Sequence, residues 1–196
     1  EVKTMEKVID VSYWQKDIDY GLVKQAGVRG VIVKITEGQE IEETWWGHVA
    51  EAEKRGLKWG VYCYSHASAP EEAAEEANEV LYLLGGKIPP MGVWFDFESP
   101  ACLESDDPTA VCSAFLNAIN AKGIPCGIYA SLSTFEAYID VEALADYVPY
   151  WVAQYNTKCD FPAEYPGKLL AGWQYSDSQS IGGVNVDFNE WYLDLD

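Results

Sequence analysis

Residues 30–64, GVIVKITEGQEIEETWWGHVAEAEKRGLKWGVYCY, carry the pattern that decides the fold. The apolar run 30–35 is rich in β-branched residues and predicts a strand. Residues 45–55 have the composition of a helix that ends at Gly56, and the apolar run 59–64 predicts a second strand. A strand, a helix and a strand in this order predict two parallel strands with the helix packed over them.

The same alternation continues on both sides of this unit. Further strands are expected at 8–11, 92–98 and 127–130, and further helices at 18–26, 70–84, 108–122, 132–139 and 141–146. After Tyr147 the pattern changes, because strands are expected at 150–154, 170–175 and 184–188 with no strong helix between them. The sequence therefore predicts five strand–helix units followed by about three strands.

Two α/β architectures fit this order of elements. A doubly wound open sheet would carry a glycine-rich G-x-G-x-x-G turn after its first strand, where phosphate groups bind. The residues that follow Val11 are SYWQKD, which contain no glycine. Eight strands allow a sheet to close on itself. We therefore expect an α/β barrel in which the last three helices are lost or reduced.

Length and charge limit the classes of protein that fit the chain. The 196 residues suit one domain with a full hydrophobic core, with residues 1–7 as a tail. A net charge of −19 repels phosphate backbones, so nucleic-acid binding is not expected. No apolar run approaches the ~18 residues of a membrane helix. Residues 1–7 also lack the apolar stretch of a signal peptide.

The cysteines and histidines do not form a known metal motif. The five cysteines have no C-x-x-C spacing, and with two histidines the chain cannot build a histidine-rich site. A cysteine nucleophile paired with histidine has no local signature in this sequence. Free and mostly buried thiols are therefore expected at Cys63, Cys102, Cys112, Cys126 and Cys159.

Acidic residues recur at the ends of the predicted strands, where a barrel of this type places its chemistry. Asp96 and Glu98 are two residues apart, so on a strand they share a face with Cα atoms about 6.5 Å apart. Two carboxyl groups this close, among aromatic residues, raise at least one pKa, and a protonated acid can protonate a leaving group. A second carboxylate completes the requirement for cleaving a glycosidic bond. A buried strand end or a divalent-metal site is the alternative interpretation. The other polar residues near strand ends are Asp10, Asp187, Lys34 and Glu37.

Aromatic residues also gather near the strand ends. The chain has 8 Trp and 13 Tyr, and their flat faces with polar edges suit sugar rings, although about half of them are expected to pack in the core. Tyr62 and Tyr64 alternate with Cys63 and so share a face. The aromatic candidates are Trp14, Tyr62, Tyr64, Tyr129, Trp151, Tyr155, Trp173 and Tyr175.

Taken in order, these segments resemble the glycoside hydrolase family 25 lysozymes. The resemblance runs from residue 8 to about residue 191, and eight short motifs in the expected order carry it. They are VIDVS with Trp14 and Gln15, KITEG at 34–38, GVYCY at 60–64, Asp96 with Glu98, GIYAS at 127–131, YWVAQY at 150–155, WQYS at 173–176 and GVNVDFN at 183–189.

The resemblance implies a flattened, irregular (β/α) barrel of eight strands and five helices. It implies cleavage of the β-1,4 bond between N-acetylmuramic acid and N-acetylglucosamine in peptidoglycan, without a metal or organic cofactor. Glu98 would be the general acid, and Asp96 would position the substrate's N-acetyl group in a substrate-assisted, retaining mechanism. Asp10 and Asp187 would line the site and tune the acid. The substrate-binding candidates are Tyr62, Tyr64, Lys34, Glu37, Tyr129, Trp151, Gln154 and Trp173.

Some features depart from the family pattern and keep alternatives open. Cys63 stands where relatives often carry histidine or another polar residue, and the acidity of the chain opposes binding to an anionic wall.

A wall-binding module is expected outside these residues, and the chain is expected to act as a monomer at the bacterial cell wall, outside the cell. A glycan-binding barrel without activity would have lost its acid, yet Glu98 is present. A chitin hydrolase would carry D-x-x-D-x-D-x-E, whereas the residues here are VWFDFE.

Overall fold

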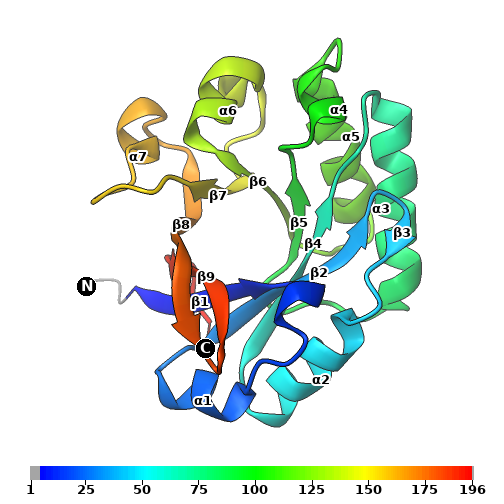
Figure 1. Cartoon of the computed structure of the whole chain (residues 1–196). Coiled ribbons are helices and arrows are strands. Elements are labelled where there is room, and N and C mark those ends of the chain that lie inside the picture. Colours follow the sequence, from blue (N-terminus) through cyan, green and yellow to red (C-terminus); the bar gives the residue numbers. More distant parts are fainter. Residues whose placement is uncertain (1–4, 196) are drawn as a thin grey trace.

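Eight strands close into a barrel in the computed structural model, which describes residues 5–195 (Figure 1). Around the ring, β1 pairs with β2 on one side and with β9 on the other, so these eight strands form a closed ring. A further two-residue strand, β3 (Glu40–Ile41), pairs only with β2. The barrel strands are β1 (Glu6–Val11), β2 (Gly30–Glu37), β4 (Lys58–Tyr64), β5 (Val93–Asp96), β6 (Cys126–Ser131), β7 (Pro149–Ala153), β8 (Leu169–Ile181) and β9 (Val184–Trp191).

The direction of the last strand differs from the expectation of a parallel sheet. The seven strands from β1 to β8 run parallel to their neighbours, whereas β9 is antiparallel to both β8 and β1. Only Gly182 and Gly183 separate β8 from β9, and two residues can join only antiparallel strands. Asp187 therefore does not end its strand as predicted. It lies in the first half of β9 and reaches the rim because that strand runs in the opposite direction.

The helices cover the barrel unevenly, as the sequence pattern predicted. Figure 1 shows α1 and α2 along the lower side and α3 and α5 at the right, whereas only α7 lies near β7 and β8. The described residues hold seven α-helices rather than about five, because α4 and α7 are single turns, and residues 141–143 form a 3₁₀ turn, η2. The helices are α1 (Tyr20–Gln25), α2 (Trp45–Lys54), α3 (Pro70–Leu84), α4 (Pro100–Leu103), α5 (Pro108–Asn120), α6 (Leu132–Tyr138) and α7 (Phe161–Glu164).

Side chains alternate between the inside and the outside of the barrel, which divides the core in two. Outward residues such as Val33 and Phe95 pack under the helices in one large cluster. Inward residues such as Trp94, Trp151 and Trp191 fill the interior in a second cluster. Gly127 is required there, since a Cβ atom at this position would lie 2.4 Å from the ring of Trp94. The interior is thus packed, and the polar inward residues are left at one end.

The N-terminal boundary lies earlier than predicted. β1 begins at Glu6, and Glu6 and Lys7 pair with Trp191 and Glu190, so they belong to the barrel rather than to a tail. Residues 1–4 of the expected tail lie outside the described residues. Among residues 5–195, no helix has both the length and the apolar composition that a membrane span requires.

Candidate active site

Asp10 and Asp187 face each other at the end of the barrel. They are direct partners in the antiparallel pairing of β1 with β9. The side-chain amide of Gln174 donates to both, with its Nε2 3.1 Å from Oδ2 of Asp10 and 3.2 Å from Oδ2 of Asp187. A second amide, Asn189 Nδ2, donates to the same Asp10 oxygen at 2.9 Å. Burial, and then the neighbouring charge of Asp187, raise the pKa of Asp10 well above its usual range.

Asp96 ends β5 and is buried beside this pair. Burial raises its pKa well above the usual range, and the charges of Glu98 and Asp10 raise it further, whereas Lys34 lowers it. Its Oδ1 atom is buried and has no hydrogen-bond partner within residues 5–195. Leaving such an atom unpaired costs about 1–3 kcal/mol, so this oxygen is well placed to accept a bond from a ligand.

Glu98 differs from the other three acids because its side chain is exposed. It lies two residues beyond the end of β5, after the fully buried Phe97. Partial burial of its carboxyl group, followed by the charge of Asp187, raises its pKa, and Lys34 lowers it. An exposed acid with a raised pKa can keep its proton nearer to neutral pH and still reach a substrate.

Lys34 is the cation that faces these acids. Its ammonium group lies 2.5 Å from Oε2 of Glu37 and 5.0 Å from the centre of the Tyr64 ring. Glu37 also lies 3.3 Å from Nε2 of His66, and Lys34 is the main cause of the lowered pKa of Glu37. The structure thus brings together three predicted residues, Lys34, Glu37 and Tyr64, with His66, which the sequence analysis did not single out.

Two tyrosines line the inner wall of the site. Tyr62 lies edge-on to Trp151, with ring centres 6.3 Å apart. Burial raises its pKa well above the usual range, and so do the charges of Asp10 and Asp96, so its hydroxyl stays protonated. Tyr129 donates its hydroxyl to Oε1 of Gln174 at 2.8 Å.

Three other predicted substrate-binding residues have their polar side-chain groups bonded within the protein. Trp151 is 1% exposed, and its Nε1 donates to Asn189 at 2.6 Å, beneath the acids. The Gln154 side chain is bonded twice to Asp160, at 2.7 Å each. Trp173 lies on the opposite face of β8 from Gln174, and its Nε1 donates to the carbonyl oxygen of Gln154. The contacts of these residues do not bring them to the four acids.

The sequence analysis missed the two amides that hold the aspartate pair. Gln174 and Asn189 lie within quoted motifs, but neither was given a role. Both are buried polar residues that stand next to aromatic residues, Gln174 between Trp173 and Tyr175 and Asn189 after Phe188. A buried amide needs partners that a core does not supply, but which residues of these strands are buried depends on the face of the barrel wall that each one occupies.

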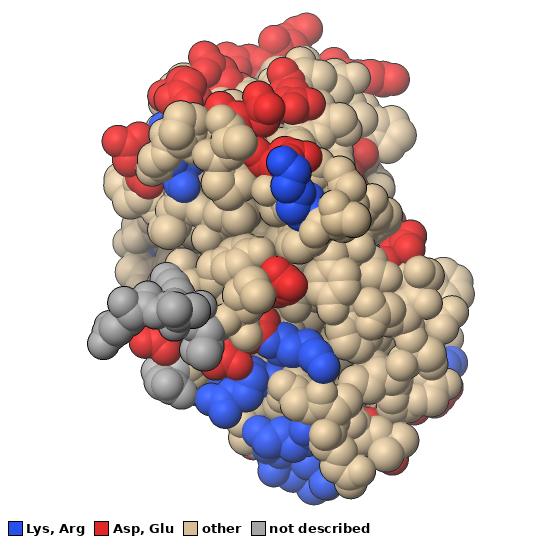
Figure 2. All heavy atoms as spheres, turned by 90° about the vertical axis from the view of Figure 1, so that its left-hand side faces the viewer, with Lys and Arg blue, Asp and Glu red and all other residues tan. Residues whose placement is uncertain are grey.

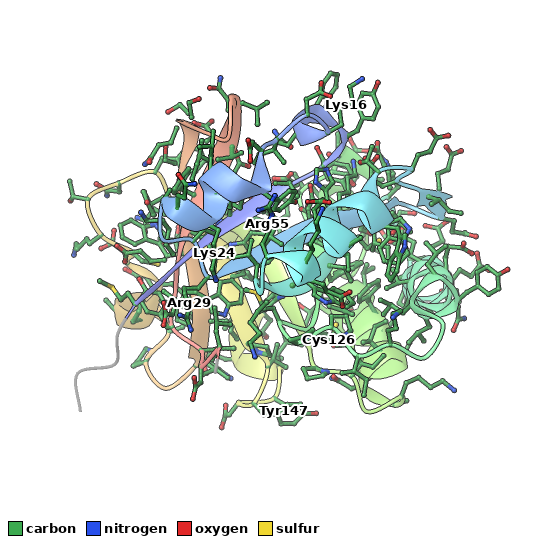
Figure 3. The ribbon with its side chains drawn as sticks, turned by 90° about the horizontal axis from the view of Figure 1, so that it is seen from below. Lys16, Lys24, Arg29, Arg55, Cys126 and Tyr147 are labelled. Carbon is green, nitrogen blue, oxygen red and sulfur yellow. The ribbon has the colours of Figure 1, made fainter. Side chains whose placement is uncertain are left out.

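Hollows on both sides extend the site. A groove of ≈ 890 Å³ runs from Glu37 and His66 along the β2–β3 turn and the start of α3. A second hollow of ≈ 460 Å³ is lined by residues 155–157 and 175–178. Trp14, 82% exposed on the 3₁₀ turn η1 (Tyr13–Gln15), belongs to the same rim. In Figure 3, Lys16 just after η1 lies at one end of the barrel, and Cys126 and Tyr147 lie at the other.

All five cysteines are free, four of them buried and Cys159 partly buried. Within residues 5–195, no group of three or more His, Cys, Asp or Glu side chains could hold a metal ion.

A barrel with several carboxyl groups at the carboxyl ends of its strands is an arrangement that glycoside hydrolases use. The family model described as glycosyl hydrolases family 25 matches residues 9–184, so the chain belongs to this family.

Named relatives agree with this assignment. The chain is 27% identical over 189 residues to the autolytic lysozyme of Clostridium acetobutylicum, covering 94% of this chain and 55% of that protein. It is 25% identical over 205 residues to lysozyme M1 of Streptomyces globisporus, covering 91% of this chain and 64% of that protein. The chain thus spans between half and two thirds of these relatives.

Solved structures share the fold. The CTP1L endolysin superposes with a TM-score of 0.80 at 27% identity, covering 97% of this chain and 67% of that one. A bacterial lysozyme from Streptomyces coelicolor gives a TM-score of 0.80 at 24% identity, covering 96% of this chain and 92% of that one.

Proposed function

We propose that this chain is a muramidase that hydrolyses the β-1,4 bond between N-acetylmuramic acid and N-acetylglucosamine in bacterial peptidoglycan. The observation that carries the proposal is the pair at the end of β5. There an exposed Glu98 with a raised pKa stands beside a buried Asp96 that has one unpaired oxygen. Membership of family 25 and the lysozyme names of two relatives support it.

In the first step, the protonated Glu98 gives its proton to the glycosidic oxygen as that bond breaks. The carbonyl oxygen of the substrate's own N-acetyl group attacks the anomeric carbon from the opposite face and forms a cyclic oxazolinium ion. Asp96 accepts a hydrogen bond from the N–H of that acetamido group and balances the positive charge that develops on it. Tyr62, at the inner wall, orients the same group.

In the second step, ionised Glu98 takes a proton from a water molecule, which attacks the anomeric carbon and opens the oxazolinium ring. The two inversions give net retention of configuration. Asp10 and Asp187 do not react in this scheme. Burial and then the charge of Asp187 raise the pKa of Glu98, and Lys34 limits that rise.

The test is digestion of purified peptidoglycan by the wild type, Glu98→Gln and Asp96→Asn, with identification of the new reducing ends. We expect N-acetylmuramic acid ends from the wild type and a loss of about 10²–10⁴-fold in Glu98→Gln. Chitin oligosaccharides serve as the matched substrate and should be cut much more slowly. Preference for chitin, or equal release by Glu98→Gln, would contradict the proposal.

We propose that residues 1–196 act as one catalytic domain, as a monomer, on the wall outside the cell, beside a wall-binding module outside these residues. Sedimentation of the purified chain tests the monomer. Comparing its rates on whole walls and on soluble wall fragments tests how far it works without another module.

A further inference from the structure

We propose that Gln174 is a positioning residue that sets how many protons the Asp10–Asp187 pair holds. Through the charge of that pair, Gln174 helps Glu98 to keep the proton that it needs as a general acid. Its link to Glu98 rests on the proposed function, whereas its effect on the two aspartates does not. Gln174 is 2% exposed. Its Nε2 donates to both aspartates, and its Oε1 accepts from Tyr129 at 2.8 Å and from Tyr155 at 3.1 Å.

The two tyrosines fix which way the carboxamide points. Their hydroxyl groups both donate to Oε1, so Nε2 must face the aspartates. In the flipped orientation, Oε1 would oppose two carboxyl oxygens and repel them. Gln174 therefore requires an acceptor oxygen on Asp10 and on Asp187 at the same time.

The aspartates meet this requirement when they share one proton. They are direct partners across β1 and β9, and like charges at this spacing in a buried site resist ionising together. With one proton between them, both Oδ2 atoms remain free to accept from Nε2. Asn189 reinforces the same state at Asp10, and Trp151 holds Asn189 in place from below.

The charge of the pair then reaches Glu98, because the charge of Asp187 raises the pKa of Glu98. An amide that keeps one negative charge on the pair therefore helps Glu98 to retain its proton. Burial raises the pKa of Asp187, and the charge of Asp177 on β8 raises it further. Other titratable groups lie around this pair on neighbouring elements. They are Lys34 on β2, Tyr62 on β4, Asp96 at the end of β5, Glu98 in the loop after it, Tyr129 on β6 and Tyr155 after β7.

Gln174→Met removes the amide at similar volume. Without the two donated hydrogen bonds the singly charged pair takes up a second proton at a higher pH, so the acid limb of the pH–activity profile should move up by about 1 pH unit. The maximal kcat should fall by about 10-fold, with KM within about 2-fold of the wild type, because Gln174 is buried and acts through the aspartates. A purely structural role would not move the pH profile.

Gln174→Glu is the second variant, in case Gln174→Met does not fold. It keeps the shape and adds a third carboxyl group, which should move the acid limb in the same direction. Tyr155→Phe removes one of the two donors to Oε1 and leaves Nε2 in place, so its shift should be smaller. Gln25→Met, on the exposed side of α1, is the matched control and should leave the profile unchanged.

The pair can also be titrated directly, by following ¹³C carboxyl shifts of labelled aspartates and assigning them with Asp10→Asn and Asp187→Asn. We expect the pair to hold its proton to a higher pH in Gln174→Met than in the wild type. The proposal would be overturned if the aspartates titrated at the same pH in Gln174→Met and in the wild type. It would also be overturned if their titration moved in Gln174→Met while the pH–activity profile did not. If the wild type proves inactive on peptidoglycan while the titration is displaced, the proposed function fails and the role of Gln174 toward the pair stands.

Discussion

At the scale of one residue, the ionised carboxyl group of Asp96 lowers the stability of the fold. Its carboxyl group is buried, one oxygen lacks a partner within the described chain, and burial is the main reason why its pKa is raised. A group whose pKa is raised in the folded state stabilises the fold fully only below its unfolded pKa. That contribution is lost as the pH rises toward the folded pKa.

Asp96→Asn should therefore stabilise the protein at alkaline pH while it abolishes most activity. We expect a gain of about 1–3 kcal/mol in the free energy of unfolding at pH 8 and almost none at pH 4, where the wild-type side chain approaches neutrality. Urea unfolding at the two pH values measures this gain. Asp17→Asn, at an exposed position, is the control. An equal gain at both pH values would show that the charge of Asp96 is not the cause.

Lys34 is expected to set where the pH–activity profile lies. It lowers the pKa of both Glu98 and Asp96, so its removal should let both rise. In Lys34→Met, we expect the alkaline limb, where Glu98 loses its proton, and the contribution of Asp96 to the acid limb to move together to higher pH. Initial rates on peptidoglycan between pH 4 and 9 measure the two limbs. Movement of either limb to lower pH would exclude this role.

At this scale the sequence predicted the acids better than the residues that hold them. Asp10, Asp96 and Glu98 could be found because parallel strands place their carboxyl ends on one rim. Gln174 could not be separated from Trp173, because the choice depends on which face of β8 turns inward. Pairing along β8 shifts register after Leu170, after Gln174 and after Ser176, so counting residues along the sequence does not give that face.

At the scale of elements, the β8–β9 hairpin is the part that sequence patterns described least well. Residues 177–180 are exposed and polar, so no apolar alternation marks them as strand. They extend β8 because β9 pairs with them, and that pairing is a tertiary fact. The strand–helix order of residues 8–130 was predictable, since each of its strands is apolar and buried beneath helices.

The tip of this hairpin is docked on the start of α1, and its two glycines should differ in importance. Both have positive φ, +61° at Gly182 and +89° at Gly183. A Cβ atom on Gly182 would also lie 2.7 Å from Cγ1 of Ile18 and 2.9 Å from the carbonyl oxygen of Asp19, whereas nothing lies within 4 Å at Gly183. The Gly182 carbonyl in turn accepts a bond from the Asp19 amide.

Gly182→Ala should therefore cost about 2–3 kcal/mol of unfolding free energy, and Gly183→Ala about 1 kcal/mol, since only the first adds a steric conflict to the backbone strain. Urea unfolding of the two variants at neutral pH gives the comparison, and Gly183→Ala serves as the matched control. Equal losses would mean that the contact with α1 does not stabilise the hairpin.

At the scale of the whole molecule, net charge is the property that most affects how the protein approaches its proposed substrate. The net charge is −19, and Figure 2 shows most acidic side chains of one face gathered along its upper edge and most basic side chains toward its lower edge, with single groups of both signs between them. An acidic protein approaching an anionic wall is repelled before the site can engage a glycan strand. The repulsion extends over about 30 Å at 0.01 M salt and about 8 Å at 0.15 M.

The rate on whole walls should consequently rise with salt, by roughly threefold between 0.01 and 0.15 M, because screening shortens the range of the repulsion. Walls stripped of their anionic polymers are the matched substrate, and on them the rate should stay nearly constant. The initial loss of turbidity measures both. A fall in rate with added salt on whole walls would mean that the basic edge attracts the wall more strongly than the acidic surface repels it, and orientation by that edge would then govern the approach of the site.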